Sequence, residues 1–186
     1  MSAIARNFPR LTAAEYLRME RQSACKHEFV DGVVYAMAGA TLRHNDISSN
    51  AHAELRALLP ASCRPYLLDA QVHIDTNERE RFYYPDVVVT CSNLDSDEYL
   101  IRHPALIIEV LSRTTEDLDR GEKFDDYRKL ISLQEYVLVH QTRPCVEVFR
   151  RRTNWETEMF EPDASIILES IQVTITIAQL YRRVAF

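Results

Sequence analysis

Glycine is scarce in this sequence. Only three glycines, Gly32, Gly39 and Gly121, occur among the 186 residues, whereas average usage is about 7%. The phosphate-cradling loops of P-loop and dinucleotide-binding proteins need several closely spaced glycines, because only glycine lets the backbone approach the phosphates so closely. The sequence therefore excludes the common nucleotide-binding motifs.

Long apolar runs are also missing. The longest stretch without a charged residue runs from Ser170 to Tyr181, which is shorter than the ~20 apolar residues of a membrane-spanning helix. The N-terminal segment MSAIARNFPR lacks the apolar core of a secretion signal. We therefore expect a cytoplasmic protein that does not enter a membrane.

Cysteines are few and far apart. The four cysteines, Cys25, Cys63, Cys91 and Cys145, are separated by 38, 28 and 54 positions. This spacing has neither the close pairs of a zinc site nor the density of a disulfide framework. We therefore expect reduced thiols in ordinary packing.

Acidic residues outnumber basic ones. The chain has 28 Asp and Glu against 22 Lys and Arg, which gives a net charge of −6 and a pI near 5.5. Non-specific binding to nucleic acid depends on neutralising phosphates with Lys and Arg. The composition therefore argues against such binding, and a nuclease interpretation has to account for the acidic surplus.

The chain is predicted to form one domain, residues 1–186, because no Pro-, Gly- or Ser-rich linker divides it. Thr12 and Glu15 have the spacing of a capping box that begins a helix. Asp31-Gly32 lies between two β-rich runs, which predicts a hairpin. Periodicity and capping signals together predict helices over 12–22, 43–59, 115–131 and 176–184, with the hairpin over 27–37.

Six further segments read as strands. Two of them, 82–91 and 104–112, are so apolar that both faces should be covered, which places them at the centre of a sheet. The others are 65–75, 135–141, 145–151 and 155–160. This order of elements predicts a mixed α/β or α+β domain, with a central sheet flanked by helices.

Two carboxylates interrupt the apolar strands. Glu109 lies in PALIIEVL and Asp86 in YYPDVVV, where a charge costs several kcal/mol unless it is paired or binds a metal. If the strands are neighbours, these side chains can converge. A carboxylate pair without a Cys/His cluster suits Mg²⁺ or Mn²⁺. The alternative is that each carboxylate meets an arginine or a backbone amide.

Three further side chains are candidates for the same site. Lys123 shares a helical stripe with Tyr127 and Leu130, so it can face the sheet and stabilise a negatively charged transition state; the alternative is a solvated lysine paired with Asp119. His44 turns toward the core at a helix start, where it either contacts the substrate or caps and packs. Gln71 borders the site or is a satisfied core amide.

The runs YYPDVVVTC, PALIIEVLS, DRGEKFDDYRKL and LQEYVLVHQTRPCVEVFRR, with the N-terminal helix and the HEFVDGVVY hairpin, resemble a bacterial family of proposed restriction endonucleases within the PD-(D/E)xK nuclease superfamily. The resemblance covers most of the chain. It implies a restriction-endonuclease-like fold and often a homodimer. The superfamily places a lysine two residues after the acidic one, where this chain has Leu111. The family is similar to others in which that lysine has moved to the following helix.

The resemblance also implies roles for individual residues. Asp86 and Glu109 correspond to metal ligands, with the Val110 carbonyl as a further one, and Lys123 to the displaced lysine. Glu28 corresponds to the acidic residue before the hairpin turn and would assist through a second ion or a water. We therefore expect a Mg²⁺- or Mn²⁺-dependent endonuclease that hydrolyses DNA. Two alternatives stay open: a decayed nuclease fold that serves as a binding or scaffold module, and a hydrolase of small phosphoesters.

Overall fold

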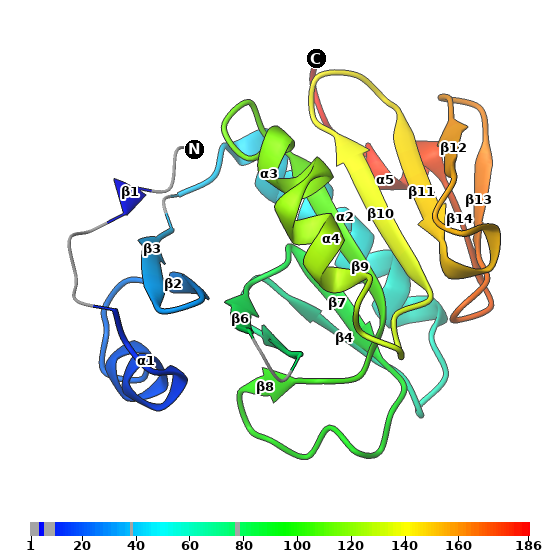
Figure 1. Ribbon diagram of the computed structural model, residues 1–186. Coiled ribbons are helices and arrows are strands. Elements are labelled where there is room, and N and C mark those ends of the chain that lie inside the picture. Colours follow the sequence, from blue (N-terminus) through cyan, green and yellow to red (C-terminus); the bar gives the residue numbers. More distant parts are fainter. Residues whose placement is uncertain (1–3, 6–9, 38, 77–78) are drawn as a thin grey trace.

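The structure, a computed structural model, describes residues 4–5, 10–37, 39–76 and 79–186. Within them the strands form two six-stranded sheets and one separate hairpin, and Figure 1 shows their arrangement. The elements are β1 (Ile4–Ala5), α1 (Ala13–Glu20), β2 (His27–Val30), β3 (Val33–Ala36), α2 (Leu42–Leu58), β4 (Arg64–Leu67), β5 (Gln71–Asp75), β6 (Glu80–Tyr83), β7 (Val87–Thr90), β8 (Leu100–Ile101), β9 (Pro104–Leu111), α3 (Glu116–Arg120), α4 (Glu122–Tyr127), β10 (Glu135–His140), β11 (Val146–Arg150), the 3₁₀ turn η1 (Arg151–Thr153), β12 (Thr157–Phe160), β13 (Ser165–Leu168), β14 (Val173–Thr176) and α5 (Ile177–Leu180).

The central sheet has the strand order β12-β11-β10-β9-β7-β4, and only its β9–β10 pair is parallel. The N-terminal sheet has the order β1-β3-β2-β6-β5-β8 and is antiparallel except for β5–β8. The mixed α/β class predicted from the sequence is therefore confirmed, with two sheets in place of one.

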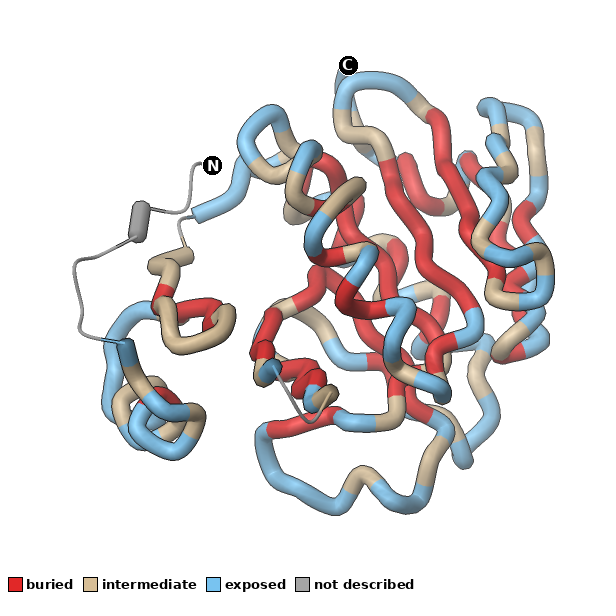
Figure 2. Tube along the Cα trace, in the orientation of Figure 1, coloured by how far each residue is buried: buried red, intermediate tan, exposed pale blue. Residues whose placement is uncertain are grey.

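Three apolar clusters hold these layers together. On one face of the central sheet, α2, α5 and the β13–β14 hairpin pack against β7, β9, β10 and β11. On the other face, α4 and strands β5 and β6 pack against the same sheet, so α2 and α4 lie on opposite sides of it (Figure 1). The helix α1 packs on the N-terminal sheet through Tyr16, Phe29 and Phe82. Strand β9 is consequently buried along nearly its whole length (Figure 2).

Local signals at the N-terminus are confirmed by the structure. Thr12 caps α1 in a reciprocal capping box with Glu15. The two-residue turn Asp31-Gly32 joins β2 to β3 with positive φ at both positions, as a hairpin turn of the right twist requires.

Three predicted elements are divided. The segment 65–75 forms β4 and β5, which belong to different sheets, and the chain reverses at Leu68, whose φ is +58°. The segment 82–91 likewise crosses from β6 in the N-terminal sheet to β7 in the central sheet, with Asp86 at the crossing. The predicted helix 115–131 is interrupted at Gly121 and ends at Tyr127.

Strands β13 and β14 were not predicted, and the predicted C-terminal helix 176–184 shortens to α5. No helix of the described residues is long and apolar enough to cross a membrane. The expectation about a secretion signal falls on residues 1–10, of which 1–3 and 6–9 lie outside the described residues.

A disulfide corrects the expectation that all cysteines are reduced. Cys63 and Cys91 form a bond across the ends of β4 and β7, where Arg64 pairs with Thr90. The antiparallel register brings the two residues opposite each other, which their separation of 28 positions does not reveal. Cys25 and Cys145 are free.

We expect the Cys63→Ser/Cys91→Ser double variant to lose about 2–4 kcal/mol of unfolding free energy, because the bond closes a long loop in the unfolded chain. Urea unfolding of both proteins measures the difference. The Cys25→Ser variant, at an exposed free thiol, is the control and should unfold like the wild type. A urea midpoint of the wild type that does not respond to dithiothreitol would contradict this prediction.

Candidate active site

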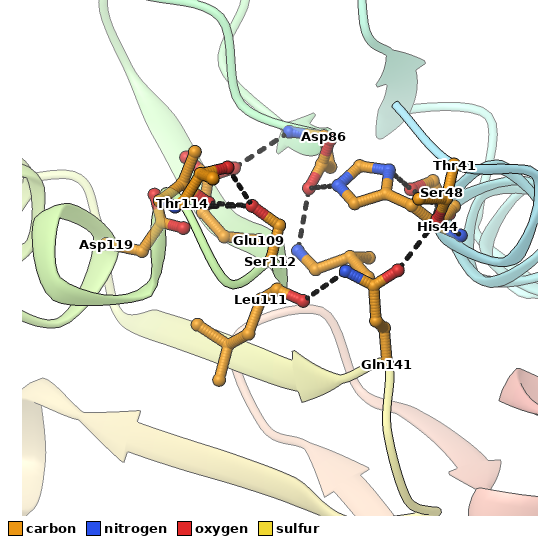
Figure 3. A network of polar contacts seen from close by, with 12 residues as sticks. Thr41, His44, Ser48, Asp86, Glu109, Leu111, Ser112, Thr114, Asp119 and Gln141 are labelled. Carbon is orange, nitrogen blue, oxygen red and sulfur yellow. Dashed lines mark hydrogen bonds and ion pairs between the residues drawn. The ribbon is translucent and has the colours of Figure 1, made fainter. Parts of the chain in front are cut away.

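The structure brings Asp86 and Glu109 together on neighbouring strands. Antiparallel pairing of β7 with β9 places Val87 opposite Ile108. The Asp86 backbone N–H donates to Glu109 Oε2 at 3.2 Å, and Asp86 Oδ2 accepts from the Val110 N–H at 2.7 Å (Figure 3). Among the described residues, no arginine pairs with either carboxylate, and each carboxylate accepts one hydrogen bond from a backbone amide.

Lys123 reaches this pair from α4, on the side of the central sheet that carries Glu109. Its Nζ lies 2.8 Å from Glu28 Oε1, 3.6 Å from Glu109 Oε1 and 3.8 Å from Asp119 Oδ1. The residue is 5% exposed. The alternative of a solvated lysine is therefore wrong, although the predicted contact with Asp119 is present within the cluster.

The cluster contains more carboxyl groups than cationic groups, and burial shifts the pKa values of its members. Burial raises the pKa of Glu109 well above its usual range, an effect that Lys123 opposes and that the charges of Asp119 and Asp86 reinforce. Burial would lower the pKa of Lys123, but the carboxylates of Glu109, Glu28 and Asp119 outweigh it and hold that pKa well above the usual range. The ammonium is therefore charged at neutral pH, whereas burial shifts Glu109 toward its protonated form.

His44 lies on the other side of Asp86. Thr41 caps α2 by accepting from the His44 N–H, which directs the imidazole inward, and His44 Nε2 lies 3.1 Å from Asp86 Oδ2. Burial lowers the pKa of His44, but the contact with Asp86 outweighs it, so the net pKa is raised. The imidazole consequently donates to Asp86 and holds one of its oxygens in place (Figure 3).

Gln71 is in a different place from the other candidates. It lies on β5 in the N-terminal sheet, and its amide donates to the Tyr16 hydroxyl in the core. It is absent from the described residues that line the cavity at the carboxylates. Gln71 is therefore a core amide with a hydrogen-bond partner, the alternative considered from the sequence, and it does not border the site.

Two residues of the cluster, Asp119 and Tyr127, were not predicted to be site residues. Asp119 is buried and lies one helical turn before Lys123, and burial raises its pKa. The Tyr127 hydroxyl, one turn after Lys123, donates to Glu109 Oε1 at 3.2 Å. The i±4 spacing around Lys123 is the signal that identifies both residues.

A cavity of about 830 Å³ opens onto the cluster. Its lining includes the ionisable residues of the cluster, which are Glu28, Asp86, Glu109, Asp119, Lys123 and His44. The cavity connects the buried charges with the surface, so a small solute or part of a larger one has access to them.

The donor set fits a hard divalent cation. Among the described residues, no group of three or more His, Cys, Asp or Glu side chains is arranged so that it could hold a metal ion by itself. Mg²⁺, however, is commonly held by one or two carboxylates and otherwise by water and substrate phosphates. Asp86, Glu109 and the Val110 carbonyl supply such oxygens, and the acidic surplus of the cluster favours a cation.

A family model and two proteins of one organism match most of this chain. The family model Uma2, described as "Putative restriction endonuclease", matches residues 13–179. One uncharacterized protein of Synechocystis sp. is 32% identical over 183 residues, covering 96% of this chain and 95% of the relative. A second from the same organism is 36% identical over 147 residues, covering 76% of this chain and 81% of the relative.

A solved structure shows the same fold. It is the crystal structure of a "putative nuclease" of the DUF820 family from Anabaena variabilis, with a TM-score of 0.76 and 20% identity, and the match covers 92% of this chain and 97% of that one. The resemblance predicted from the sequence is confirmed. Because the family match extends over most of the chain, this protein belongs to the Uma2 family of proposed restriction endonucleases.

Proposed function

We propose that this protein is a metal-dependent nuclease that hydrolyses phosphodiester bonds of DNA. One observation carries the proposal: the backbone N–H of Asp86, directly before β7, donates to the Glu109 carboxylate on β9, and the buried ammonium of Lys123 lies 3.6 Å from Glu109. Family membership supports the same activity. Two acidic groups and a lysine at one cavity are the groups that phosphoryl transfer to water requires.

Asp86, Glu109 and the Val110 carbonyl would hold Mg²⁺ or Mn²⁺. When bound, the ion would acidify a water ligand and neutralise charge on the phosphate. Glu109 would have to be ionised to hold the ion, a form that burial disfavours and that the neighbouring Lys123 favours. His44 and the Val110 N–H keep Asp86 oriented throughout, since both contact Asp86 Oδ2.

Lys123 supplies a fixed positive charge beside the reacting phosphate. During hydrolysis the water oxygen bonds to phosphorus, the ester P–O bond breaks, and the leaving oxygen takes up a proton. Negative charge grows on the phosphate oxygens in the transition state, and a nearby ammonium stabilises it. Glu28 holds Lys123 at 2.8 Å, which gives Glu28 a positioning role in place of the second-ion role expected from the sequence.

The net negative charge of the whole chain does not prevent DNA phosphates from binding at this cavity. The carboxylates gather at the floor of the cavity, where a divalent ion offsets them. Lys26, Arg43 and Arg113 belong to the lining of the same cavity, and Arg113 is exposed. These cations give DNA phosphates a local contact surface. The cytoplasmic location and the homodimer expected from the sequence stay predictions.

Calorimetric titration with Mn²⁺ tests the metal site. We expect the wild type to take up the ion and both the Asp86→Asn and the Glu109→Gln variants to bind it far more weakly, because each loses an anionic ligand. Glu156→Gln, at an exposed glutamate, is the matched control and should bind like the wild type. Absence of uptake by the wild type at millimolar Mn²⁺ would contradict the proposal and favour the scaffold alternative.

A further inference from the structure

Tyr35 lies beside the charged cluster and has no part in the chemistry described above. It is on β3 directly opposite Glu28 on β2, so both side chains occupy the same face of the N-terminal sheet. Glu28 uses that face to reach Lys123, and both Glu28 and Tyr35 line the cavity. The ring is partly exposed, and no described residue forms a hydrogen bond with its hydroxyl.

The charges lie too deep for a base-paired substrate. Glu109 is 3% exposed, Lys123 5%, Glu28 7% and Asp86 9%. A cavity of about 830 Å³ has the size of a small-molecule pocket, roughly 300–1,000 Å³. The major groove of a DNA duplex alone is about 12 Å wide and admits a whole helix, so the duplex is far larger than this cavity. An unpaired strand is narrow enough to bring one phosphate to the floor.

The walls have the chemistry that a nucleobase needs. Besides Tyr35, the lining contains Tyr84 and the apolar side chains of Leu68, Leu111 and Leu118. The Lys26 Nζ lies 5.6 Å from the centre of the Tyr84 ring. Proteins that hold single strands combine aromatic rings, on which bases stack, with cations that follow the backbone. Both features are present here, next to the proposed catalytic groups.

We propose that the cavity accepts an unpaired DNA strand, with a base stacked on Tyr35 and the adjacent phosphate directed to Asp86, Glu109 and Lys123. This inference rests on the proposed nuclease function and specifies its substrate. A duplex becomes a substrate only where its strands separate, because paired bases hold the phosphates outside the cavity.

Fluorescence anisotropy in Ca²⁺ tests the binding step with a labelled 12-nucleotide strand and with the same strand in a duplex. We expect the single strand to bind at least about tenfold more tightly.

Tyr35→Ala should weaken binding of the single strand about tenfold, the scale of one lost base stack, whereas Tyr35→Phe keeps the ring and should bind within about twofold of the wild type. Tyr66→Ala, at a partly exposed tyrosine outside the cavity lining, is the control and should leave binding unchanged. Thermal unfolding checks that Tyr35→Ala is folded. If it is not, Tyr35→Leu, which keeps an apolar side chain but has no ring, takes its place and should weaken binding to a similar extent.

Equal or tighter binding of the duplex would overturn the proposal, and so would unchanged binding by a folded Tyr35→Ala variant. Cleavage in Mg²⁺ separates this failure from failure of the nuclease function. A duplex with a single-stranded tail should be cut in the tail only. Cleavage throughout the duplex would keep the nuclease function and remove the strand preference. Tyr35-dependent strand binding without cleavage of any nucleic acid would keep the strand site and remove the nuclease function.

Discussion

Replacing Glu109 by glutamine is expected to lower Mg²⁺-dependent DNA cleavage by at least about 10³-fold. The loss of an anionic ligand removes several kcal/mol of charge stabilisation in the transition state, and about 4 kcal/mol corresponds to that factor. Burial favours the protonated form of Glu109 when no ion is bound. Glutamine imitates this neutral form, so the variant should unfold at nearly the same temperature as the wild type. Cleavage of a labelled oligonucleotide and a thermal scan measure the two effects.

Asp86→Asn should lose activity to a similar extent, because it removes the other carboxylate of the pair. The exposed variant Glu156→Gln serves again as the control and should retain activity. Wild-type cleavage rates in both Glu109→Gln and Asp86→Asn would remove the mechanism. Preference of the wild type for a small phosphodiester dye over any DNA would instead support the small-ester alternative.

Replacing Lys123 by methionine is expected to damage both activity and stability. The ammonium is buried among Glu28, Glu109 and Asp119, and removing one partner of a buried ion pair costs about 3–5 kcal/mol of unfolding free energy. Loss of the positive charge beside the phosphate should also lower the cleavage rate by about 10²-fold or more. Urea unfolding and initial cleavage rates measure these two losses.

The stability loss in Lys123→Met should grow with pH. Burial already raises the pKa of Glu109 and of Asp119 in the folded protein, and Lys123 opposes both shifts. Without the lysine these pKa values rise further. A carboxyl group whose pKa is higher in the folded state binds its proton more tightly there, so the stability it contributes is present at low pH and is lost as the pH rises through the folded pKa. The urea midpoint of the variant should therefore decrease as the pH is raised from mildly acidic to alkaline values.

Lys129→Met is the matched control for this variant. Lys129 follows the same helix and contacts Asp126 at 2.7 Å, but its side chain is 43% exposed. The buried partner Asp126 keeps its contacts with Arg81 and Tyr83 in this variant, so its stability should stay close to that of the wild type at every pH. A Lys123→Met protein as stable as Lys129→Met would contradict the charge cluster described here.

Local signals predicted much of the fold. The capping box at Thr12 and the hairpin at Asp31-Gly32 depend on neighbouring residues only, and both are present. The division of 65–75 and 82–91 between two sheets was not predictable, because apolar periodicity shows which face of a strand is buried and not which sheet the strand joins. The Cys63–Cys91 bond was not predictable either, because it depends on the register between two strands.

The candidate site was predictable where a residue contradicts its surroundings. Asp86 and Glu109 stand out because each is a carboxylate in an apolar strand, and the structure places them in contact. Lys123 required the family resemblance, since its spacing alone favoured a solvated lysine paired with Asp119. Gln71 was a candidate because its strand could border the site, but its partner Tyr16 is 55 positions away in the chain, and no sequence pattern indicates that contact.

The cluster draws its members from every layer of the molecule. Glu28 comes from the N-terminal sheet, Glu109 from the central sheet, Lys123 from the helix packed between them, and Asp86 from the crossing between the sheets. A chain with only one sheet formed holds an incomplete set of these groups. Under the proposed function, a copy of the protein in which only one of the two sheets has formed would therefore lack cleavage activity.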